Sequence, residues 1–343
     1  MAEYKEIKGV NIKNISGDPP VVNDGDIWYN TSLDKLRVKQ GPTVGGWSTL
    51  SPTPLPQTDF GMSGDSTGSI IFGGRDFYTG PAPGPTAHNN AISQKWDGTT
   101  WTGAPALNNK RQEGMGFGSS DTNGFYATGA TPNAPGPGYA FTSASESWNG
   151  SSWTSKPGVN NSRVVGGGAG TNTAGIIAQG YFFHPFVTYS NTESWNGSSW
   201  TTVNSMNTNR YLLGMGGTST SAIGAGGSGK SNSSESWNGT SWTATPNLNN
   251  GRERIGGAAD SNTKALVFSG ENSPDQFNGI TESWNGSSWT NVNNMVTTGP
   301  SVRTGFEGGQ GATNALAVHR TSETTTEAWS DSGAGGNRSV ESA

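Results

Sequence analysis

The chain has 343 residues, among them 53 glycines, 13 tryptophans and no cysteine, and its formal net charge is −5. The lack of cysteine excludes disulfides and thiolate metal sites, and an acidic balance without a basic stripe argues against nucleic-acid binding. No apolar run reaches membrane-spanning length and the N-terminus lacks the apolar core of a signal peptide, so we expect no membrane insertion. Abundant Gly, Ser, Thr and Asn without a helical period predict an all-β chain.

The first 43 residues differ in pattern from the remainder of the chain. Two alternating segments, Asp26 to Asn30 and Lys35 to Lys39, flank a short polar turn and predict a β-hairpin. We expect residues 1–43 to form a separate N-terminal segment that contains this β-hairpin. Its first 15 or so residues are either an arm that docks the protein onto a larger particle or a disordered terminus.

A repeated W-N-G-x-x-W motif organises residues 44–330. Its leading tryptophans recur every 42 to 52 residues, which is the span of one four-stranded propeller blade, and they are Trp96, Trp148, Trp195, Trp237, Trp284 and, in a worn copy, Trp329. Asn-Gly between β-rich flanks predicts a hairpin with a type I′ turn. The two tryptophans of each motif are therefore expected on adjacent outer strands of one blade, while glycines allow close approach of the inner strands.

The last unit lacks a closing tryptophan, and the missing strand is found near the N-terminus. The segment around Trp47 is similar in sequence to the segment around Trp242. We expect residues 44–50 to supply the fourth strand of the last blade by pairing with Glu327 to Trp329, which leaves no unpaired edge. Six blades follow, with residues 331–343 as a flexible C-terminal tail.

The order of residues within a unit resembles the kelch repeat. The fourth unit shows Arg210, Gly226-Gly227, Glu235, Trp237 and Trp242 in the kelch order, although it has Trp-Asn-Gly where kelch units usually have Tyr-Asp. The likeness covers roughly residues 50–330. It implies a six-bladed kelch-like β-propeller, and a propeller as such implies no particular activity.

An arginine near the start of a unit and a glutamate two residues before its leading tryptophan occur together. Five units carry both, as Arg111 with Glu146, Arg163 with Glu193, Arg210 with Glu235, Arg252 with Glu282, and Arg303 with Glu327. The first unit has Gln57 and Gln94 at these places. Either the two residues pair within a blade in a structural role, or both simply vary in an atypical unit.

The loop after the second strand differs most in length and sequence between units, and in several units it contains aromatic residues. The candidate recognition residues are Phe77, Tyr78, Tyr139, Phe141, Phe182, Phe183, His184, Phe186 and Tyr189. Equivalent loops of a propeller emerge on one face, where such residues would form a binding patch. The patch is expected to contact a cell-surface glycan or protein, to contact another subunit of the same assembly, or to pack over the blades.

No residue set in the sequence has the pattern of a catalytic, cofactor or metal site. His88, His184 and His319 have no metal-ligand spacing, and no nucleotide or hydrolase motif stands in its proper context. A propeller enzyme that acts on glycans would need converging carboxylates, but the loops offer chiefly Asp76, Glu271 and Asp275. We therefore expect no enzyme activity, no cofactor and no bound metal.

Two further resemblances point to a virus particle. The stretch G-D-I-W-Y-N-T from Gly25, followed by K-L-R-V and G-G-W, resembles a segment of bacteriophage tail and fibre proteins. The repeated E-S-W-N-G-S-S-W-T resembles virion structural proteins of marine cyanophages. Together they imply a fibre, tail or capsid-surface protein, made in the host cytoplasm, with other virion proteins as partners. A glycan-active enzyme and a cellular kelch-type adaptor are the alternatives, and homo-oligomer formation stays open.

Overall fold

The chain forms two structural units, which we describe separately. The computed structural model describes residues 13–16, 27–39, 45–77, 87–132, 139–183, 185–272, 274, 276–297, 308–319, 324–331 and 337–340. Within these residues there are strands, turns and bends but no helix, which confirms the all-β class. The small unit comprises Met1–Gly45 and Asp331–Ala343, and the large unit comprises Gly46–Ser330.

The small unit is built on the predicted hairpin. Its sheet has the order β1 (Lys13–Ile15), β2 (Ile27–Asn30), β3 (Lys35–Lys39) and β36 (Asn337–Val340). β2 and β3 are antiparallel, with Ile27 opposite Val38, and Trp28 on β2 is buried. The side-chain oxygen of Asn30 accepts hydrogen bonds of 3.1 Å from the N–H groups of Ser32 and Leu33 and so orders the turn.

The fourth strand of the small unit corrects the prediction of a flexible C-terminal tail. β36 runs antiparallel to β3, with Leu36 opposite Val340. The prediction of a flexible tail is wrong for Asn337–Val340, because a four-residue polar segment gives no strand signal of its own. It becomes a strand by completing the hydrogen bonds of the free edge of β3.

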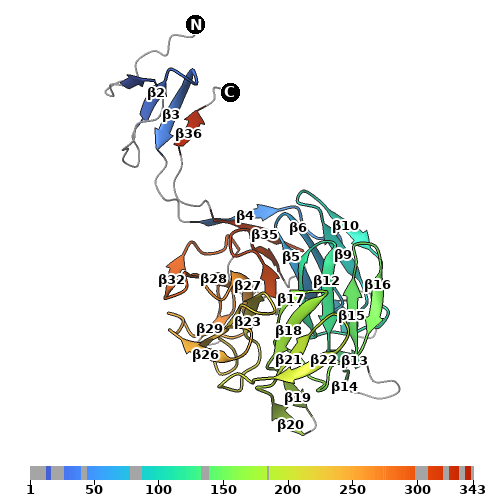
Figure 1. Cartoon of the computed structure of the whole chain (residues 1–343). Helices are drawn as coiled ribbons and strands as arrows, with labels where there is room; N and C mark the ends of the chain where they lie inside the picture. The colour runs from blue at the N-terminus through green and yellow to red at the C-terminus, as the bar shows by residue number, and fades with distance from the viewer. Residues whose placement is uncertain are drawn as a thin grey trace. The chain divides into compact units, whose positions relative to one another are not determined.

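The large unit begins with four antiparallel sheets of four strands each (Figure 1). The first sheet contains β5 (Gly61–Asp65), β6 (Gly68–Phe72), β9 (Ser93–Trp96) and β10 (Trp101–Ala104). The second contains β11 (Met115–Ser120), β12 (Asn123–Ala127), β15 (Ser145–Trp148) and β16 (Trp153–Lys156). The third contains β17 (Gly167–Thr171), β18 (Ala174–Ala178), β21 (Thr192–Trp195) and β22 (Trp200–Val203). The fourth contains β23 (Gly214–Gly217), β24 (Ala222–Ala225), β25 (Ser234–Trp237) and β26 (Trp242–Thr245).

Two further sheets complete the large unit. The fifth contains β27 (Gly256–Ser261), β28 (Lys264–Phe268), β31 (Thr281–Trp284) and β32 (Trp289–Val292), and β33 (Gly308–Gln310) adds to it parallel to β27. The sixth contains β34 (Leu316–Val318), β35 (Thr326–Ser330) and β4 (Gly46–Leu50). The repeated antiparallel sheets give a β-propeller-like fold.

Four of the variable loops are not irregular but form two-stranded ribbons. The ribbons are β7 (Arg75–Phe77) with β8 (Ala87–Asn89), β13 (Ala130–Pro132) with β14 (Tyr139–Phe141), β19 (Tyr181–Phe183) with β20 (Phe186–Thr188), and β29 (Glu271–Asn272) with β30 (Gln276–Phe277). The first strand of each ribbon forms a β-bridge to the segment that precedes the innermost strand of the same unit, as between Val164 and Tyr181. The ribbons are therefore fixed to the sheets at their base.

The innermost strands approach one another so closely that their glycines are required. β5, β11, β17, β23 and β27 contact one another in this order, and β33 contacts all five of them. A Cβ atom on Gly168 would lie 2.8 Å from the carbonyl oxygen of Gly116, and one on Gly216 would lie 2.7 Å from the amide nitrogen of Ala259. The predicted close approach of inner strands is confirmed, and it leaves no room for side chains at these positions.

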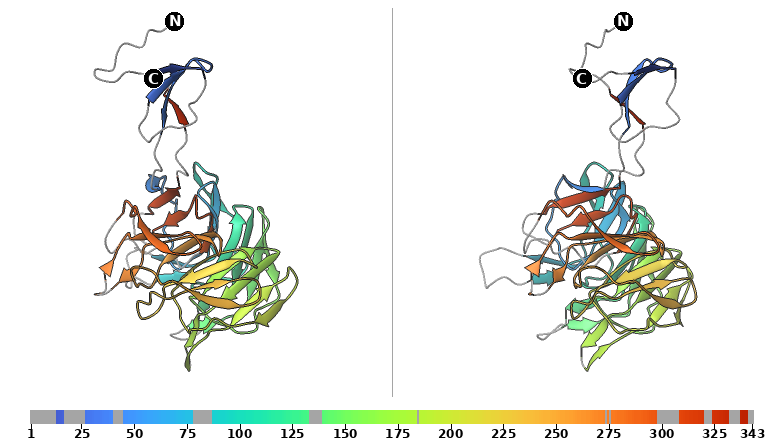
Figure 2. Two further views of the ribbon diagram at one scale, coloured as in Figure 1. Left: turned by 60° about the vertical axis from the view of Figure 1, so that its left-hand side comes forward. Right: turned by 90° about the vertical axis from the view of Figure 1, so that its left-hand side faces the viewer.

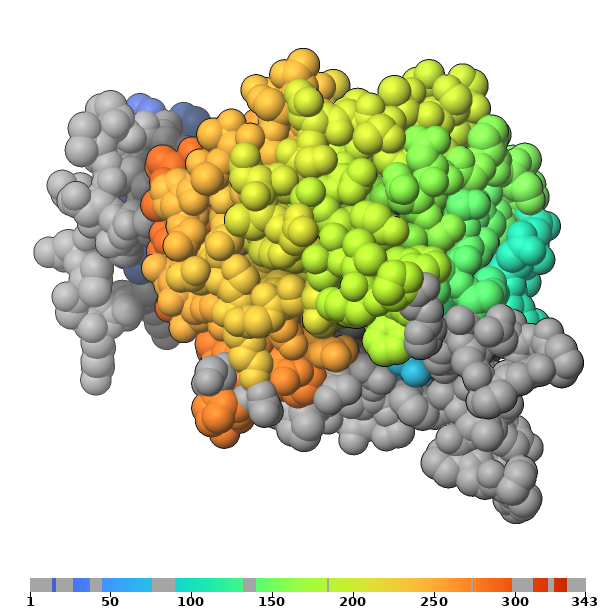
Figure 3. Space-filling view, turned by 90° about the horizontal axis from the view of Figure 1, so that it is seen from below, coloured from blue at the N-terminus to red at the C-terminus, as the bar shows by residue number. Residues whose placement is uncertain are grey.

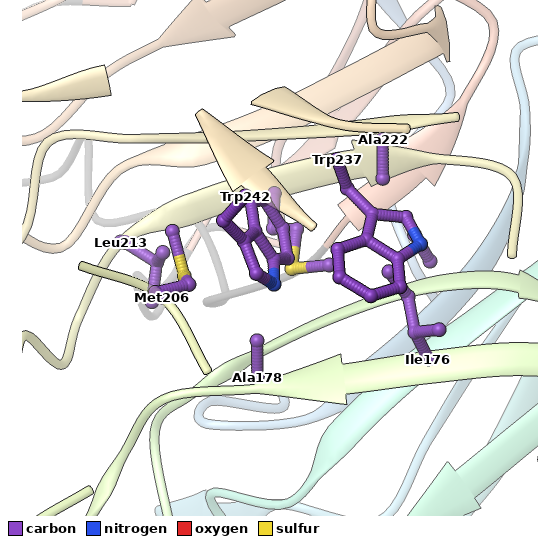
Figure 4. Close-up of a cluster of buried hydrophobic side chains, with 9 residues drawn as sticks. Ile176, Ala178, Met206, Leu213, Ala222, Trp237 and Trp242 are labelled. Atoms are coloured by element: carbon purple, nitrogen blue, oxygen red, sulfur yellow. The ribbon is translucent and has the colours of Figure 1, made fainter. Parts of the chain in front are cut away.

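Tryptophans and aliphatic residues fill the spaces between sheets. Figure 4 shows one such cluster, in which Ile176 and Ala178 of the third sheet face Trp237 and Trp242 of the fourth. The two indole rings lie on adjacent strands with their centroids 5.4 Å apart. The indole N–H of Trp242 also donates a 2.8 Å hydrogen bond to the hydroxyl of Thr192 in the third sheet, so the same side chain joins two sheets.

The N-terminal strand of the large unit closes the last sheet, as the sequence predicts. β4 pairs antiparallel with β35, with Trp47 opposite Trp329, and their rings lie 5.7 Å apart. Trp47 also packs against Phe268 of the fifth sheet, at 4.8 Å between centroids, and donates a 3.0 Å hydrogen bond to Thr281. A single side chain from one end of the large unit therefore joins sheets formed by the other end.

The W-N-G motifs form the predicted hairpins but not with the predicted turn. Trp148 pairs with Trp153 across a four-residue loop, in which Gly150 has a φ of 95°. The asparagine does not need positive φ, because its side-chain oxygen accepts hydrogen bonds from the N–H groups of Ser151 (3.0 Å) and Ser152 (2.9 Å). The expectation of a type I′ turn is wrong, since side-chain capping replaces the second positive φ.

The ring closure predicts the effect of removing Trp47. We expect Trp47→Ala to lower the free energy of unfolding by about 3–5 kcal/mol, because the large ring leaves a cavity between two sheets. Urea denaturation followed by circular dichroism measures this loss. Leu55→Ala is the control, since Leu55 is 47% exposed and its truncation should cost less than about 0.5 kcal/mol. Equal effects of the two substitutions would contradict the closure.

Candidate functional site

Four arginine–glutamate pairs are buried in the second to fifth sheets. Each arginine lies in the segment before the innermost strand and each glutamate lies on the third strand of the same sheet. The N–O distances are 2.7 Å for Arg111–Glu146, 2.8 Å for Arg163–Glu193, 3.0 Å for Arg210–Glu235 and 3.3 Å for Arg252–Glu282. The predicted pairing is confirmed for these four, and Arg303 lies outside the described residues.

Each glutamate also holds the connector, the segment that runs from the outer strand of one sheet to the next sheet. The carboxylate of Glu146 accepts hydrogen bonds from the backbone N–H groups of Asn108 (2.8 Å) and Asn109 (3.3 Å). The corresponding first connector amides are Asn160 for Glu193, Asn207 for Glu235, Asn249 for Glu282 and Val296 for Glu327. Because the paired side chains are almost inaccessible to water, these residues fix the backbone and contact no ligand.

The first sheet replaces the ion pair by two amides. Gln94 Nε2 donates a hydrogen bond to Gln57 Oε1. Gln94 Oε1 accepts a 2.9 Å bond from the connector N–H of Leu55, and Gln57 Nε2 donates to the carbonyl oxygen of Gly73 at 2.8 Å. Arg210 makes the equivalent bond to Gly226. Because both charged residues are replaced together, the first sheet keeps the same network of hydrogen bonds without an ion pair.

The sixth sheet places a histidine against its glutamate. His319 follows β34, and its Nε2 lies 3.0 Å from a carboxylate oxygen of Glu327, with both side chains fully buried. Burial acts to raise the pKa of Glu327, but hydrogen bonds from His319, Thr297 and Val296 outweigh burial and lower that pKa to about 2. In the fifth sheet, burial lowers the pKa of Arg252 to about 10, so this arginine stays charged at neutral pH.

The candidate recognition residues are only partly brought together. Phe141 and Phe182, from neighbouring ribbons, lie 4.9 Å apart, and Phe183 and Phe186 lie 6.2 Å apart. Tyr189 is half-buried, and its ring contacts none of the other described aromatic rings. Of the remaining candidates, Tyr78 and His184 lie outside the described residues, and only the backbone of Phe77 and Tyr139 is described.

Two tyrosines that sequence reasoning missed lie at the centre of this aromatic group. Tyr181 starts β19 and contacts Tyr211, the residue after Arg210, with ring centroids 5.0 Å apart. Phe186 lies 5.5 Å from Tyr181 and 6.1 Å from Tyr211. The only sequence signal for Tyr211 is its place directly after the repeat arginine.

The aromatic hairpin β19–β20 projects from the large unit (Figures 1 and 2). Phe183 is 50% exposed, Phe186 56% and Val187 39%, and these three residues form the hairpin patch. Beneath them, Tyr181 and Tyr211 pack on a small buried cluster that includes Val164. Figure 3 shows the face of the large unit on this side, where segments coloured green to yellow form one continuous surface.

A ladder of backbone hydrogen bonds joins the segments that lead into the innermost strands. N–H groups of Glu113, Val165, Leu212 and Arg254 donate in turn to the carbonyl oxygens of Asp59, Glu113, Val165 and Leu212, at 2.8–2.9 Å. These five residues, the backbone ring, all have φ between 50° and 62°. Such values are uncommon outside glycine, and a β-branched residue such as Val165 adopts them only under constraint.

Charged side chains gather beside the backbone ring in the first, second and fifth sheets. Arg75 Nε donates a 2.7 Å hydrogen bond to Asp59, and its guanidinium lies 3.7 Å from Glu113. Arg254 lies 3.5 Å from Glu271. Tyr181 lies close enough to these groups for their charges to act on its hydroxyl. Burial raises the pKa of Tyr181 to about 12, and the charge of Glu113 adds to that rise.

The described residues contain neither a metal-ligand cluster nor a membrane-spanning helix. No three His, Cys, Asp or Glu side chains in these segments are placed to hold a metal ion. The side chain of His88 is not described, and that of His319 is buried against Glu327. No helix of the described chain is long and apolar enough to cross a membrane.

Comparison with known proteins places the fold but not the function. No family model and no curated protein matches the chain. A solved structure described as "Structure of YjhT" is similar, with a TM-score of 0.62 over 81% of this chain and 95% of that chain. Only 10% of the aligned residues are identical, so the similarity extends to the fold alone.

The comparison of the Arg–Glu ion pairs with the Gln57–Gln94 amide pair predicts how the stability of a sheet responds when its charges are removed. We expect Glu193→Gln to lower the free energy of unfolding by about 3–5 kcal/mol, because it leaves the Arg163 guanidinium buried without an anion. The double variant Arg163→Gln/Glu193→Gln copies the first sheet and should recover more than half of that loss. Urea denaturation of both variants provides the measurement. A double variant as unstable as Glu193→Gln alone, or more so, would show that the amide pair is no substitute.

The lowered pKa of Glu327 predicts a dependence of stability on acid. A carboxylate with a folded-state pKa of about 2 and an ordinary value of 4.5 stabilises the fold fully above about pH 4.5, and this contribution disappears as the pH falls to about 2. We therefore expect the stability difference between the natural chain and Glu327→Gln to shrink over that interval. Denaturation at successive pH values measures it, and a constant difference would refute the assignment.

Proposed function

We propose that this chain is a non-enzymatic structural protein of a bacteriophage virion, in the fibre, the tail or the capsid surface. Its large unit is a six-bladed kelch-like β-propeller that contacts other virion proteins and engages the host surface. The protein is made in the host cytoplasm and resides in the virion.

The cyclic contacts of the inner strands support the count of six blades. β5, β11, β17, β23 and β27 follow one another in contact, and β33, which contacts all five, bridges β27 and β5 as a sixth innermost strand. The sixth sheet has three strands of its own, and its missing inner strand is β33, which hydrogen-bonds to β27. Closure by β4 then gives every blade an outer strand that carries a tryptophan.

The virion assignment is supported by the sequence motifs of both units. Residues 27–31 of the G-D-I-W-Y-N-T stretch form β2 and the start of its turn in the small unit, and the W-N-G hairpins join the two outer strands of sheets in the large unit. Both motifs resemble phage structural proteins.

The observation that carries the recognition role is the hairpin patch. Phe183, Phe186 and Val187 expose apolar surface on a ribbon that projects from a rigid scaffold. Exposed apolar groups of this kind are typical of protein or ligand contact sites. The alternative enzyme and adaptor functions have no comparable support among the described residues. Of the loop acids considered for catalysis, Glu271 is held by Arg254 and Lys230.

The proposal predicts that the chain is a component of purified particles. We expect mass spectrometry of gradient-purified phage that encodes this chain to detect it in fixed proportion to the major capsid protein. Cryo-EM of the same particles should show a ring of six blades at the fibre, tail or capsid surface. Absence of the chain from purified, infectious particles would overturn the virion assignment.

A further inference from the structure

The face that carries the ribbons has a second feature, around the backbone ring, which shares only Phe186 with the hairpin patch. Ribbon residues Arg75, Tyr181 and Glu271 are held next to this ring by bridges to Thr58, Val164 and Glu253. The ring and the ribbon bases therefore place side chains from five sheets around one centre. Charged groups come from the first, second and fifth sheets, and aromatic groups come from the third and fourth.

The charged side chains of this centre balance one another. Arg75 pairs with Asp59 and Glu113, and Glu271 pairs with Arg254 and Lys230. Among the described side chains, three cations thus face three carboxylates, and a fourth carboxylate, Glu253, accepts the backbone N–H groups of Gly229 and Lys230 beside them. The centre therefore has little attraction for a simple anion. It nevertheless offers many hydrogen-bond donors and acceptors. The side chains of Arg254, Arg75 and Glu113 are 34%, 21% and 20% exposed, so a ligand can reach them.

The aromatic side of the centre offers the exposed ring of Phe186 and the half-buried rings of Tyr181 and Tyr211 with their hydroxyl groups. Tyr181, Tyr211 and Phe186 lie within 6.1 Å of one another, measured between centroids. Tyr181 remains protonated at neutral pH, because burial and the charge of Glu113 raise its pKa to about 12, against the opposing charges of Arg254 and Arg75. Its hydroxyl makes no hydrogen bond to any described residue, and so a donor is left for a ligand.

The backbone of the same centre is held in an unfavourable conformation. The five ring residues adopt left-handed φ values although none is glycine. Such values are disfavoured for residues other than glycine. Because they recur at the equivalent position of five units, they belong to the scaffold, which holds the backbone of Glu113 and Arg254 in place.

We propose that this centre binds a neutral glycan, with the apolar face of a sugar ring on Tyr181, Tyr211 and Phe186 and its hydroxyl groups on Glu113, Arg254 and Arg75. A polyhydroxylated ring without charge uses donors and acceptors together and needs an aromatic face, which is the combination that the centre supplies. A charged ligand would have to break the internal ion pairs first. The inference deepens the proposed host recognition and rests on it.

The test uses the full-length chain and needs no virus particle. An array of neutral, sialylated and uronate-containing bacterial and eukaryotic oligosaccharides serves as the probe, and calorimetry measures affinity for the strongest neutral binder. We expect Arg254→Gln and Tyr181→Phe each to weaken binding by about tenfold, the loss that one hydrogen bond to a charged or hydroxyl group produces. Lys95→Gln is the matched control, because it removes an ion pair with Asp121 away from the centre and should leave affinity unchanged.

Three outcomes would overturn the inference. They are no binding to any neutral glycan, binding confined to acidic glycans, and neutral-glycan binding that Phe183→Ala reduces while Arg254→Gln and Tyr181→Phe do not. Circular dichroism of each variant confirms that its fold is retained. A chain found in virions that binds no glycan refutes only this inference, whereas a glycan-binding chain absent from virions refutes only the proposed location.

Discussion

The fold of the large unit depends on an acceptor side chain that is withdrawn from water in each of its sheets. Where it is a glutamate, its two oxygens face the connector from the preceding sheet, as where Glu193 accepts from Asn160 and Asn161. The same carboxylate neutralises a buried guanidinium. In the first sheet the single side-chain oxygen of Gln94 accepts from Leu55. A buried carboxylate without partners would destabilise the fold, and so would buried connector N–H groups without acceptors. The hydrogen bonds between them remove both costs.

This network leaves the ribbons free to vary. The inner strands are fixed by glycine contacts, the spaces between sheets by tryptophans, and the connectors by glutamates, so none of these elements needs the ribbon residues. Only the ribbon bases are tied to the scaffold, through bridges such as that between Glu253 and Glu271. A rigid support with variable ribbons on one side is the usual arrangement in proteins that recognise surfaces.

Repetition made much of this structure predictable from the sequence. The W-N-G hairpins, the closing strand at Trp47 and the Arg–Glu pairs all follow from residues that recur in register, where comparison between units reveals a shared role. Features that occur once could not be predicted in this way. β36 depends on a free edge elsewhere in the chain, and His319 replaces no recurring residue. The aromatic centre was not predicted from the sequence, because Tyr211 follows a repeat arginine at a position where other units have unrelated residues.

Native-state hydrogen exchange at the connector amides tests the central role of the buried carboxylates most directly. The N–H groups of Asn160, Asn207 and Asn249 lie in segments without secondary structure, yet each is bonded to a buried glutamate. We predict that they exchange only through global unfolding, at rates close to those of the innermost strands. Exchange as fast as that of Gly150, in an exposed turn, would contradict the account, because the connectors would then be held by something other than the carboxylates.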